Sequence, residues 1–67
     1  MLNEKEIQFL KEVMNYPSNK EASEGMNIPI EEIKNLLQII YSKLGVQNRI
    51  QACIKLYKIE NILNNKK

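Results

Sequence analysis

The stretch from Ile30 to Leu44, I-E-E-I-K-N-L-L-Q-I-I-Y-S-K-L, followed by Gly45 and Val46, decides how this chain folds. Its apolar residues recur at the spacing of one helix face and are Ile33, Leu36, Leu37, Ile40 and Leu44. The opposite face is polar and carries Glu31, Lys34, Asn35, Gln38 and Ser42, with Glu32 and Ile39 at its edge. Gly45 predicts the end of the helix, because glycine adopts the left-handed C-cap conformation without a Cβ penalty. We therefore expect a helix of about four turns whose polar face is free to contact a partner.

Capping signals on either side of this stretch predict three further helices. Asn3 with Glu6 forms a capping-box pattern, and Ser18 and Asn48 are followed by a glutamate or glutamine at the same spacing. Pro17 predicts the end of the first helix, because proline disfavours helical backbone in the residue before it. The predicted helices span residues 3–15, 18–25, 30–44 and 48–63, with a frayed polar tail at 64–67.

The composition excludes several classes of protein. With 67 residues, 43% of them hydrophobic, we expect one small domain over residues 1–67 with a modest core. The chain has no histidine and a single cysteine, Cys53, which excludes a tetrahedral zinc site, a Ser-His-Asp triad and a Cys-His dyad. No nucleophile and base, facing carboxylate pair or phosphate-binding loop can be assembled from the remaining residues. We therefore expect no enzyme, no catalytic residue, no metal and no cofactor.

The sequence carries no signal for a membrane or for export. No apolar run approaches the ~18 residues that span a bilayer. The N-terminus lacks a basic region followed by an apolar one. We expect a cytoplasmic protein, and a lone thiol fits that reducing compartment.

The charges are distributed unevenly along the chain. Residues 1–42 carry four lysines and seven glutamates, a net charge of −3, whereas residues 43–67 carry six basic residues and Glu60, a net charge of +5. The net charge of the whole chain, +2, is small beside the strongly basic domains that usually bind nucleic acids. Charge alone leaves DNA binding and protein binding both open.

The predicted order of elements describes a helix-turn-helix module, with a short second helix, a turn of three to four residues and an exposed third helix. Three segments, L-N-E-K-E-I-Q-F-L (2–10), S-N-K-E-A (18–22) and I-Y-S-K-L-G-V-Q-N-R-I-Q-A (40–52), make the pattern specific. They resemble the L-T-x-R-E-x-E-V-L, S-N-K-E-I-A and I-Y-x-K-L-G-V-x-x-R-x-x-A segments of the LuxR/GerE family of DNA-binding domains. The resemblance covers nearly the whole chain without gaps. It implies an all-α, four-helix LuxR/GerE-like helix-turn-helix domain.

The third helix departs from the family where it should meet DNA. The family usually reads S-x-x-T-V-K-x-H, and this chain has P-I-E-E-I-K-N-L at residues 29–36. Pro29 stands for the capping serine, Glu32 for a phosphate-binding threonine and Leu36 for the histidine. Glu31 and Ile39 stand where a basic residue and an asparagine are common. Carboxylates at a helix start stabilise the helix dipole but repel phosphate.

The candidate DNA-contacting residues fall into two groups. The candidates for reading bases are Lys34, Asn35, Gln38 and Glu31. Lys34 is able to contact guanine, and a glutamate is able to accept from cytosine, but a solvated lysine and a dipole-stabilising carboxylate are the alternatives. The candidates for positioning on the DNA backbone are Asn19, Lys20, Glu32, Ser42, Lys43 and Arg49. For Asn19, Lys20 and Arg49 this role is implied by the resemblance, and capping or a surface ion pair is the alternative.

The fourth predicted helix carries more apolar surface than one packed face can use. One stripe consists of Ile50, Cys53, Ile54 and Tyr57, and another of Ala52, Leu56, Ile59 and Leu63. The resemblance implies that this helix forms a homodimer, which places two third helices about one DNA turn, roughly 34 Å, apart. Our candidates for the dimer interface are Ile50, Ile54, Tyr57 and Lys58.

Two functions fit these residues. The first is a small stand-alone transcriptional regulator that binds double-stranded DNA as a homodimer, with the third helix in the major groove. The second is an interaction protein on the same fold that binds another regulator or the transcription machinery instead of DNA. The sequence shows no receiver or ligand-binding domain, so we expect control to come from expression or from partners.

Overall fold

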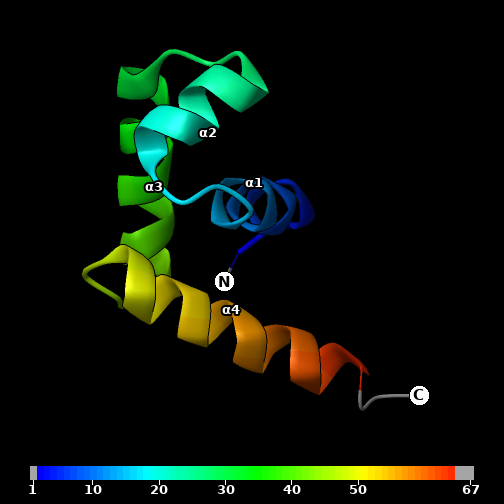
Figure 1. Ribbon diagram of the computed structural model, residues 1–67. Coiled ribbons are helices and arrows are strands. Elements are labelled where there is room, and N and C mark those ends of the chain that lie inside the picture. Colours follow the sequence, from blue (N-terminus) through cyan, green and yellow to red (C-terminus); the bar gives the residue numbers. More distant parts are fainter. Residues whose placement is uncertain (1, 65–67) are drawn as a thin grey trace.

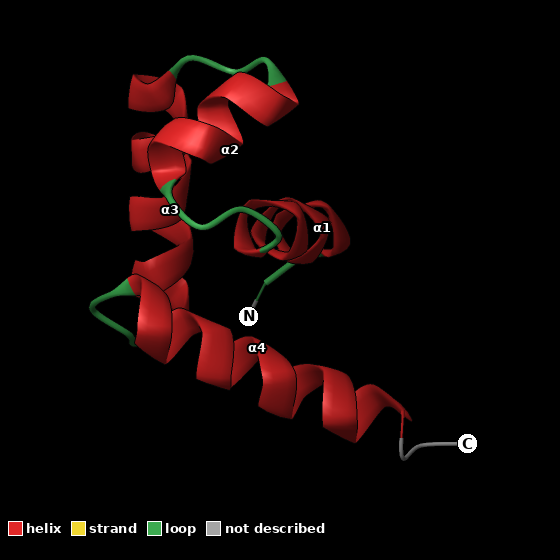
Figure 2. Ribbon diagram, viewed as in Figure 1, coloured by secondary structure: helices red, strands yellow, loops and turns green. Residues whose placement is uncertain are grey.

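The structure is a computed structural model that describes residues 2–64, with side chains described as far as Asn61. Its helices are α1 (Glu4–Met14), α2 (Asn19–Met26), α3 (Ile30–Leu44) and α4 (Arg49–Asn64). The all-α, four-helix fold expected from the sequence is confirmed (Figures 1 and 2). Each helix begins and ends within one residue of its predicted bound. Asn64, predicted to fray, is the last residue of α4, and the rest of the predicted tail, 65–67, lies outside the described residues.

The first helix begins with a complete capping box. The Asn3 Oδ1 accepts from the Glu6 backbone N–H at 2.8 Å, and the Glu6 carboxylate accepts from the Asn3 N–H at 3.0 Å. Two backbone donors that lack intrahelical partners are thereby satisfied. The helix ends at Met14, and its C-cap, Asn15, lies two residues before Pro17.

The caps of α2 and α4 are simpler than the sequence predicted. Ser18 Oγ accepts from the Glu21 N–H at 3.2 Å, but the Glu21 carboxylate bonds the Ser18 hydroxyl instead of the Ser18 N–H. Asn48 Oδ1 accepts from the Gln51 N–H at 2.9 Å, whereas the Gln51 side chain accepts from the Gln47 N–H at 2.8 Å. The second half of each predicted box is therefore redirected to a neighbouring group.

Left-handed residues end α2 and α3. Asn27 has φ 57° and closes α2, and Gly45 has φ 72° and closes α3 as predicted. Asparagine and glycine are the residues that most readily adopt this conformation. Gly25 has a different role, because a Cβ at this position would overlap the ring of Tyr16.

The core lies where three helices meet α3. Figure 1 shows α2 alongside the start of α3 and α4 leaving from its other end, and α1 packs against each of the other helices. The buried apolar residues are Leu10, Val13, Ala22, Ile33, Leu37, Ile40, Ala52 and Leu56. Leu36, predicted on the buried stripe of α3, is 37% exposed because it lies at the edge of the helix face that meets α1.

Two ion pairs join α1 to other helices. Lys11 Nζ lies 3.0 Å from Glu60 Oε2 on α4, and Lys43 Nζ, at the end of α3, donates to Glu6 Oε2 at 2.7 Å. These pairs are partly exposed, so we expect modest contributions to stability. Within residues 2–64, no helix is long and apolar enough to cross a membrane.

Candidate nucleic-acid interface

α3 presents one face to the core and the other to the solvent. Ile33, Leu37 and Ile40 are buried. The predicted contact residues on this helix are all exposed, and they are Glu31, Glu32, Lys34, Asn35, Gln38, Ser42 and Lys43. The buried stripe therefore sets the orientation of the helix and leaves its polar side chains free.

A shallow groove runs between α3, the start of α2 and the turn into α4. Its polar lining consists of Asn19, Lys34, Gln38, Ser42 and Gln47, which we call the polar flank. The structure thus brings together two of the predicted base-reading residues and two of the predicted backbone-contacting residues. Asn35 and Glu31 lie exposed on α3 outside this groove, and Lys20 is exposed in the first turn of α2.

Lys34 is the cation of the polar flank. Glu31 Oε2 lies 4.0 Å from its Nζ, and the two side chains are 55% and 80% exposed. An exposed ion pair at this separation is weak. The Lys34 ammonium group is therefore available to an acceptor such as a guanine or a phosphate.

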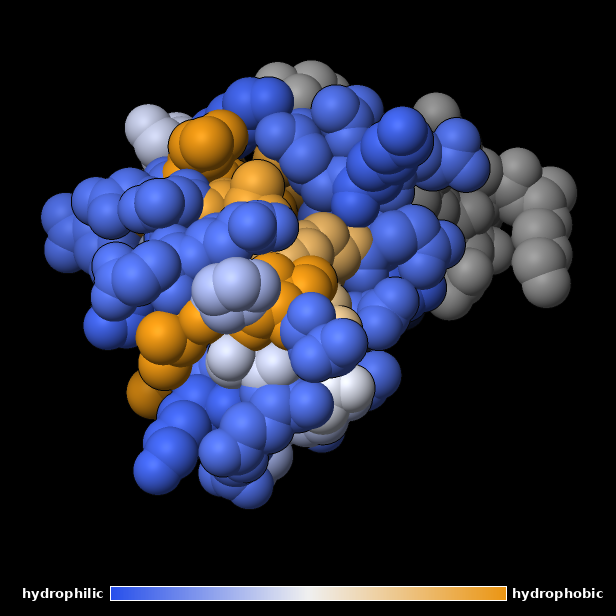
Figure 3. Space-filling model, turned by 90° about the horizontal axis from the view of Figure 1, so that it is seen from above, coloured by the Kyte–Doolittle hydropathy of each residue, from blue (hydrophilic) through white to orange (hydrophobic). Residues whose placement is uncertain are grey.

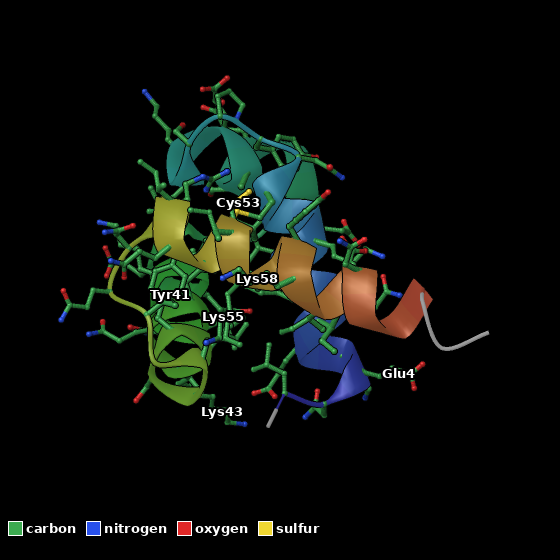
Figure 4. The ribbon with its side chains drawn as sticks, turned by 90° about the horizontal axis from the view of Figure 1, so that it is seen from below. Glu4, Tyr41, Lys43, Cys53, Lys55 and Lys58 are labelled. Carbon is green, nitrogen blue, oxygen red and sulfur yellow. The ribbon has the colours of Figure 1, made fainter. Side chains whose placement is uncertain are left out.

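Sequence reasoning did not find Gln47 and Tyr41, which also line the groove. Gln47 occupies an unspecified position in the L-G-V-x-x-R segment, and only the tertiary structure brings it to the same groove as Lys34 and Asn19. Tyr41, near the end of α3, lies beside the turn into α4 (Figure 4). Burial raises the pKa of the Tyr41 hydroxyl, against the opposing charge of Arg49, so the group stays protonated and able to donate at neutral pH.

The opposite side of α3 faces the start of α1 and is apolar. A small hollow there is lined by Phe9, Leu36 and Ile39, which we call the apolar flank, together with Ile40 and residues of the first turn of α1. Leu36 is 37% exposed and Ile39 is 52% exposed. Apolar surface is also left open on the face seen from above, where Figure 3 shows it between polar regions.

Lys43, a predicted phosphate contact, is held on the same side as the apolar flank. Its hydrogen bond to the Glu6 carboxylate is the main reason that the pKa of Glu6 lies below its ordinary value, and the Asn3 N–H adds to the effect. The positive charge of Lys43 is thus already partnered within the chain. Its contact with DNA stays a prediction, and that contact competes with this ion pair.

Arg49 is turned toward the corner between α1 and α2. Its Nη2 donates to the carbonyl of Val13 at 2.8 Å and to the carbonyl of Tyr16, and its Nη1 donates to Asn19 Oδ1 at 3.1 Å. The side chain is half-buried by these contacts. The predicted phosphate contact of Arg49 stays a prediction, but the residue already has acceptors inside the fold.

One of the two apolar stripes of α4 is exposed. Ala52 and Leu56 are buried in the core, whereas Ile50, Ile54 and Tyr57 are 74%, 53% and 68% exposed. Cys53 and Lys58 are exposed beside them. Figure 4, viewed from below, shows Cys53 and Lys55 on opposite sides of α4 with Lys58 between them. The candidates for the dimer interface therefore share one uncovered face.

A short helix, a turn and an exposed third helix define a helix-turn-helix DNA-binding domain. The family model GerE, described as bacterial regulatory proteins of the luxR family, matches residues 1–56, so the chain belongs to this family. The predicted membership is confirmed. The domain of this family is a non-enzymatic DNA-binding domain of transcriptional regulators, which confirms that the chain is not an enzyme. No significant match was found among curated proteins or among solved structures.

Proposed function

We propose that this luxR-family domain binds double-stranded DNA as a homodimer, with α3 of each subunit in the major groove. Lys34, Asn35 and Gln38 read bases, and Glu31 accepts from a cytosine amino group or stabilises the helix. The residues that position the domain on the DNA backbone are Asn19, Lys20, Ser42 and Lys43. Glu32 and Arg49 are the remaining backbone candidates, and Arg49 already has acceptors within the fold.

The observation that carries this proposal is the polar flank of α3. It brings amide, hydroxyl and ammonium groups from α2, α3 and the turn into α4 to one concave surface. Base edges in the major groove offer acceptors and donors that suit these groups. A lysine with only a loose carboxylate partner, Lys34, lines this surface.

The exposed stripe of α4 supports the homodimer. Ile50, Ile54 and Tyr57 are more than half exposed, and they recur at the spacing of one helix face. A small domain has little stability to spare, and burial of this stripe against a second copy adds about 25 cal/mol for each Å² of apolar surface. Two-fold pairing through this face then carries two copies of α3 to one side of the dimer.

A titration on duplex DNA at several salt concentrations tests DNA binding. Each phosphate neutralised by a cation contributes about −0.9 to the slope of log K against log salt. We expect a slope of several units for the unmodified chain. Binding that is absent, or that does not change with salt, would reject the proposal.

Sedimentation of the unmodified chain and of Tyr57→Glu tests the homodimer. A buried charge without a partner is costly, so Tyr57→Glu should give a folded monomer that binds DNA more weakly. Lys55→Glu is the matched control, because Lys55 is exposed on another side of α4, next to Lys43 and Leu44. A monomeric unmodified chain at high micromolar concentration would contradict the dimer.

A second candidate function is supported by the apolar flank. Leu36 and Ile39 expose apolar surface beside Phe9. Helical spacing places the exposed carboxylate of Glu32 on the same side of α3. Such a surface suits a protein partner in transcription better than it suits a phosphate backbone. A chain that binds a related regulator and no DNA in the titration would favour this function.

A further inference from the structure

The side chain of Arg49 joins α4 to the corner between α1 and α2. Its guanidinium group donates to the carbonyls of Val13 and Tyr16 and to the side chain of Asn19. The Tyr16 carbonyl lies in the turn after α1, and the Val13 carbonyl, at the C-terminal end of α1, also accepts from the Tyr16 N–H at 3.1 Å. A cation is favoured at this end of a helix. Arg49 therefore supplies two hydrogen bonds to backbone carbonyls and one to a side chain at this corner.

This side chain is also the direct polar link between α2 and α4. No Cα atom of α2 lies within 8 Å of a Cα atom of α4. Among the described residues, the hydrogen bond from Arg49 to Asn19 is the only one between these helices. Asn19 is the first residue of α2 and lines the polar flank with Lys34 and Gln38.

We infer that Arg49 is a positioning residue that holds the first turn of α2 in place against α3 and α4. Through its bond to Asn19, Arg49 connects the polar flank to the first turn of α4. The exposed stripe of α4 begins in this turn, because Ile50 directly follows Arg49 in the sequence. The consequence for DNA binding rests on the proposed function. In a dimer paired through α4, the position of α4 then sets the position of each α2 N-terminus on the DNA.

The same geometry argues against a phosphate as the main partner of Arg49. The guanidinium group is planar and presents its donors in a rigid fork. This fork donates at the same time to Val13 on α1, to Asn19 on α2 and to Tyr16 in the turn between them. If the group turned toward a phosphate, the part-buried carbonyls of Val13 and Tyr16 would lose this donor. Asn19 would lose the bond that orients its amide over the groove.

Hydrogen exchange of the free protein tests the positioning role without DNA. Arg49→Lys keeps the charge and removes the fork, so the amides of Glu21 and Ala22, in the first turn of α2, should exchange about tenfold faster. The amides of α3 should not change. Lys20→Gln is the matched control, since it alters a neighbouring exposed cation and should leave exchange unchanged. Unchanged exchange in Arg49→Lys would overturn the inference, whatever the DNA results.

The salt titration separates positioning from a phosphate contact. A positioning role predicts that Arg49→Lys binds DNA about tenfold more weakly with an unchanged salt slope, and that Asn19→Ala adds little to it. A phosphate contact predicts that Arg49→Lys keeps its affinity and that Arg49→Gln has a slope shallower by about 0.9, as expected for Lys20→Gln. The second pattern would overturn the inference.

Two further outcomes have a defined meaning. If Arg49→Lys does not fold, Asn19→Ala replaces it as the test, because it removes one acceptor of Arg49 and leaves the bonds to the Val13 and Tyr16 carbonyls intact. It should then speed exchange at the start of α2, and no change would overturn the inference. If the unmodified chain binds no DNA, the proposed function fails, and hydrogen exchange still decides the role of Arg49.

Discussion

One flank of α3 faces α2 and the turn into α4, and the other flank faces the start of α1. The polar flank gathers amides, a hydroxyl and the ammonium group of Lys34 around a groove. The apolar flank exposes Leu36 and Ile39, and Glu6, which lines the same hollow, is bonded to Lys43. Gln38 and Ile39 are adjacent in sequence and fall on different flanks, because successive residues of a helix are rotated by about 100°.

The number of cations near a helix is therefore not the number available to a ligand. Lys34 and Lys43 lie on the same helix, and both are predicted DNA contacts. Lys34 has a carboxylate at 4.0 Å, whereas Lys43 donates to one at 2.7 Å. A phosphate gains less from Lys43, because the ion pair with Glu6 must first be broken.

The largest effect on DNA affinity is expected from a substitution in the polar flank. Lys34→Ala should weaken binding to the preferred DNA by about 1–3 kcal/mol and relax its sequence preference, because a base contact is lost. Lys5→Ala is the matched control, since Lys5 lies beside the apolar flank. Duplex titrations measure both variants. Equal losses in the two variants would remove the distinction between the flanks.

The next effect comes from the carboxylates at the start of α3. Glu31→Lys with Glu32→Thr should strengthen DNA binding about tenfold, because both negative charges near the phosphates are removed. If one glutamate instead reads cytosine, the double variant should keep its non-specific affinity and lose discrimination. Unchanged binding to every duplex would mean that neither glutamate faces the DNA.

A smaller effect should follow from release of Lys43. Glu6→Gln removes the carboxylate that binds this lysine, so Lys43 becomes free to reach a phosphate. The salt slope of DNA binding should become steeper by at most about 0.9. Glu12→Gln is the control, because Glu12 is exposed and makes no ion pair within the described residues. An unchanged salt slope in Glu6→Gln would mean that Lys43 lies away from the DNA backbone.

The same ion pair predicts a pH dependence of stability. The folded protein lowers the pKa of Glu6 below its ordinary value of 4.5, chiefly through the Lys43 hydrogen bond. The pair therefore stabilises the fold above the unfolded pKa, and this stabilisation is lost as the pH falls through the folded pKa. Thermal unfolding between about pH 6 and pH 3 should show a smaller loss for Glu6→Gln than for the unmodified chain. Parallel losses in both proteins would mean that the ion pair does not form.

The smallest effect is expected on the apolar flank itself. Ile39→Asn should change stability by no more than about 0.5 kcal/mol, because the side chain is half exposed. It should leave DNA affinity almost unchanged, whereas Gln38→Ala on the polar flank should weaken it. A large loss of DNA affinity in Ile39→Asn would show that the apolar flank also touches the duplex.

The helices were readable from the sequence because their signals are local. Asn3 with Glu6, Ser18 and Asn48 mark helix starts, and Gly45 marks an end, since each bonds or bends only its own neighbours. The buried stripe of α3 followed from helical spacing, with Leu36 as the exception at the edge. The segments at 2–10, 18–22 and 40–52 carried the family, which the match over residues 1–56 confirms.

The packing of the helices selects which of several locally equivalent surfaces is buried and which stays exposed. The sequence offered two apolar stripes on α4, and packing placed Ala52 and Leu56 in the core while Ile50, Ile54 and Tyr57 stayed exposed. The same holds for charged and polar residues far apart in the chain. Gln47 joins Asn19 in one groove, Lys43 meets Glu6, and Arg49 reaches the carbonyls of α1.

The physical reason lies in the range of the interactions. Spacing and capping depend on contacts within about one helix turn, so the sequence determines them directly. The partner of a long side chain depends on how helices cross, and a lysine or arginine reaches whichever acceptor that crossing brings near. The sequence alone therefore determined four helices and their family, and the packing of α1 and α4 against α3 decided which cations remain free to bind DNA.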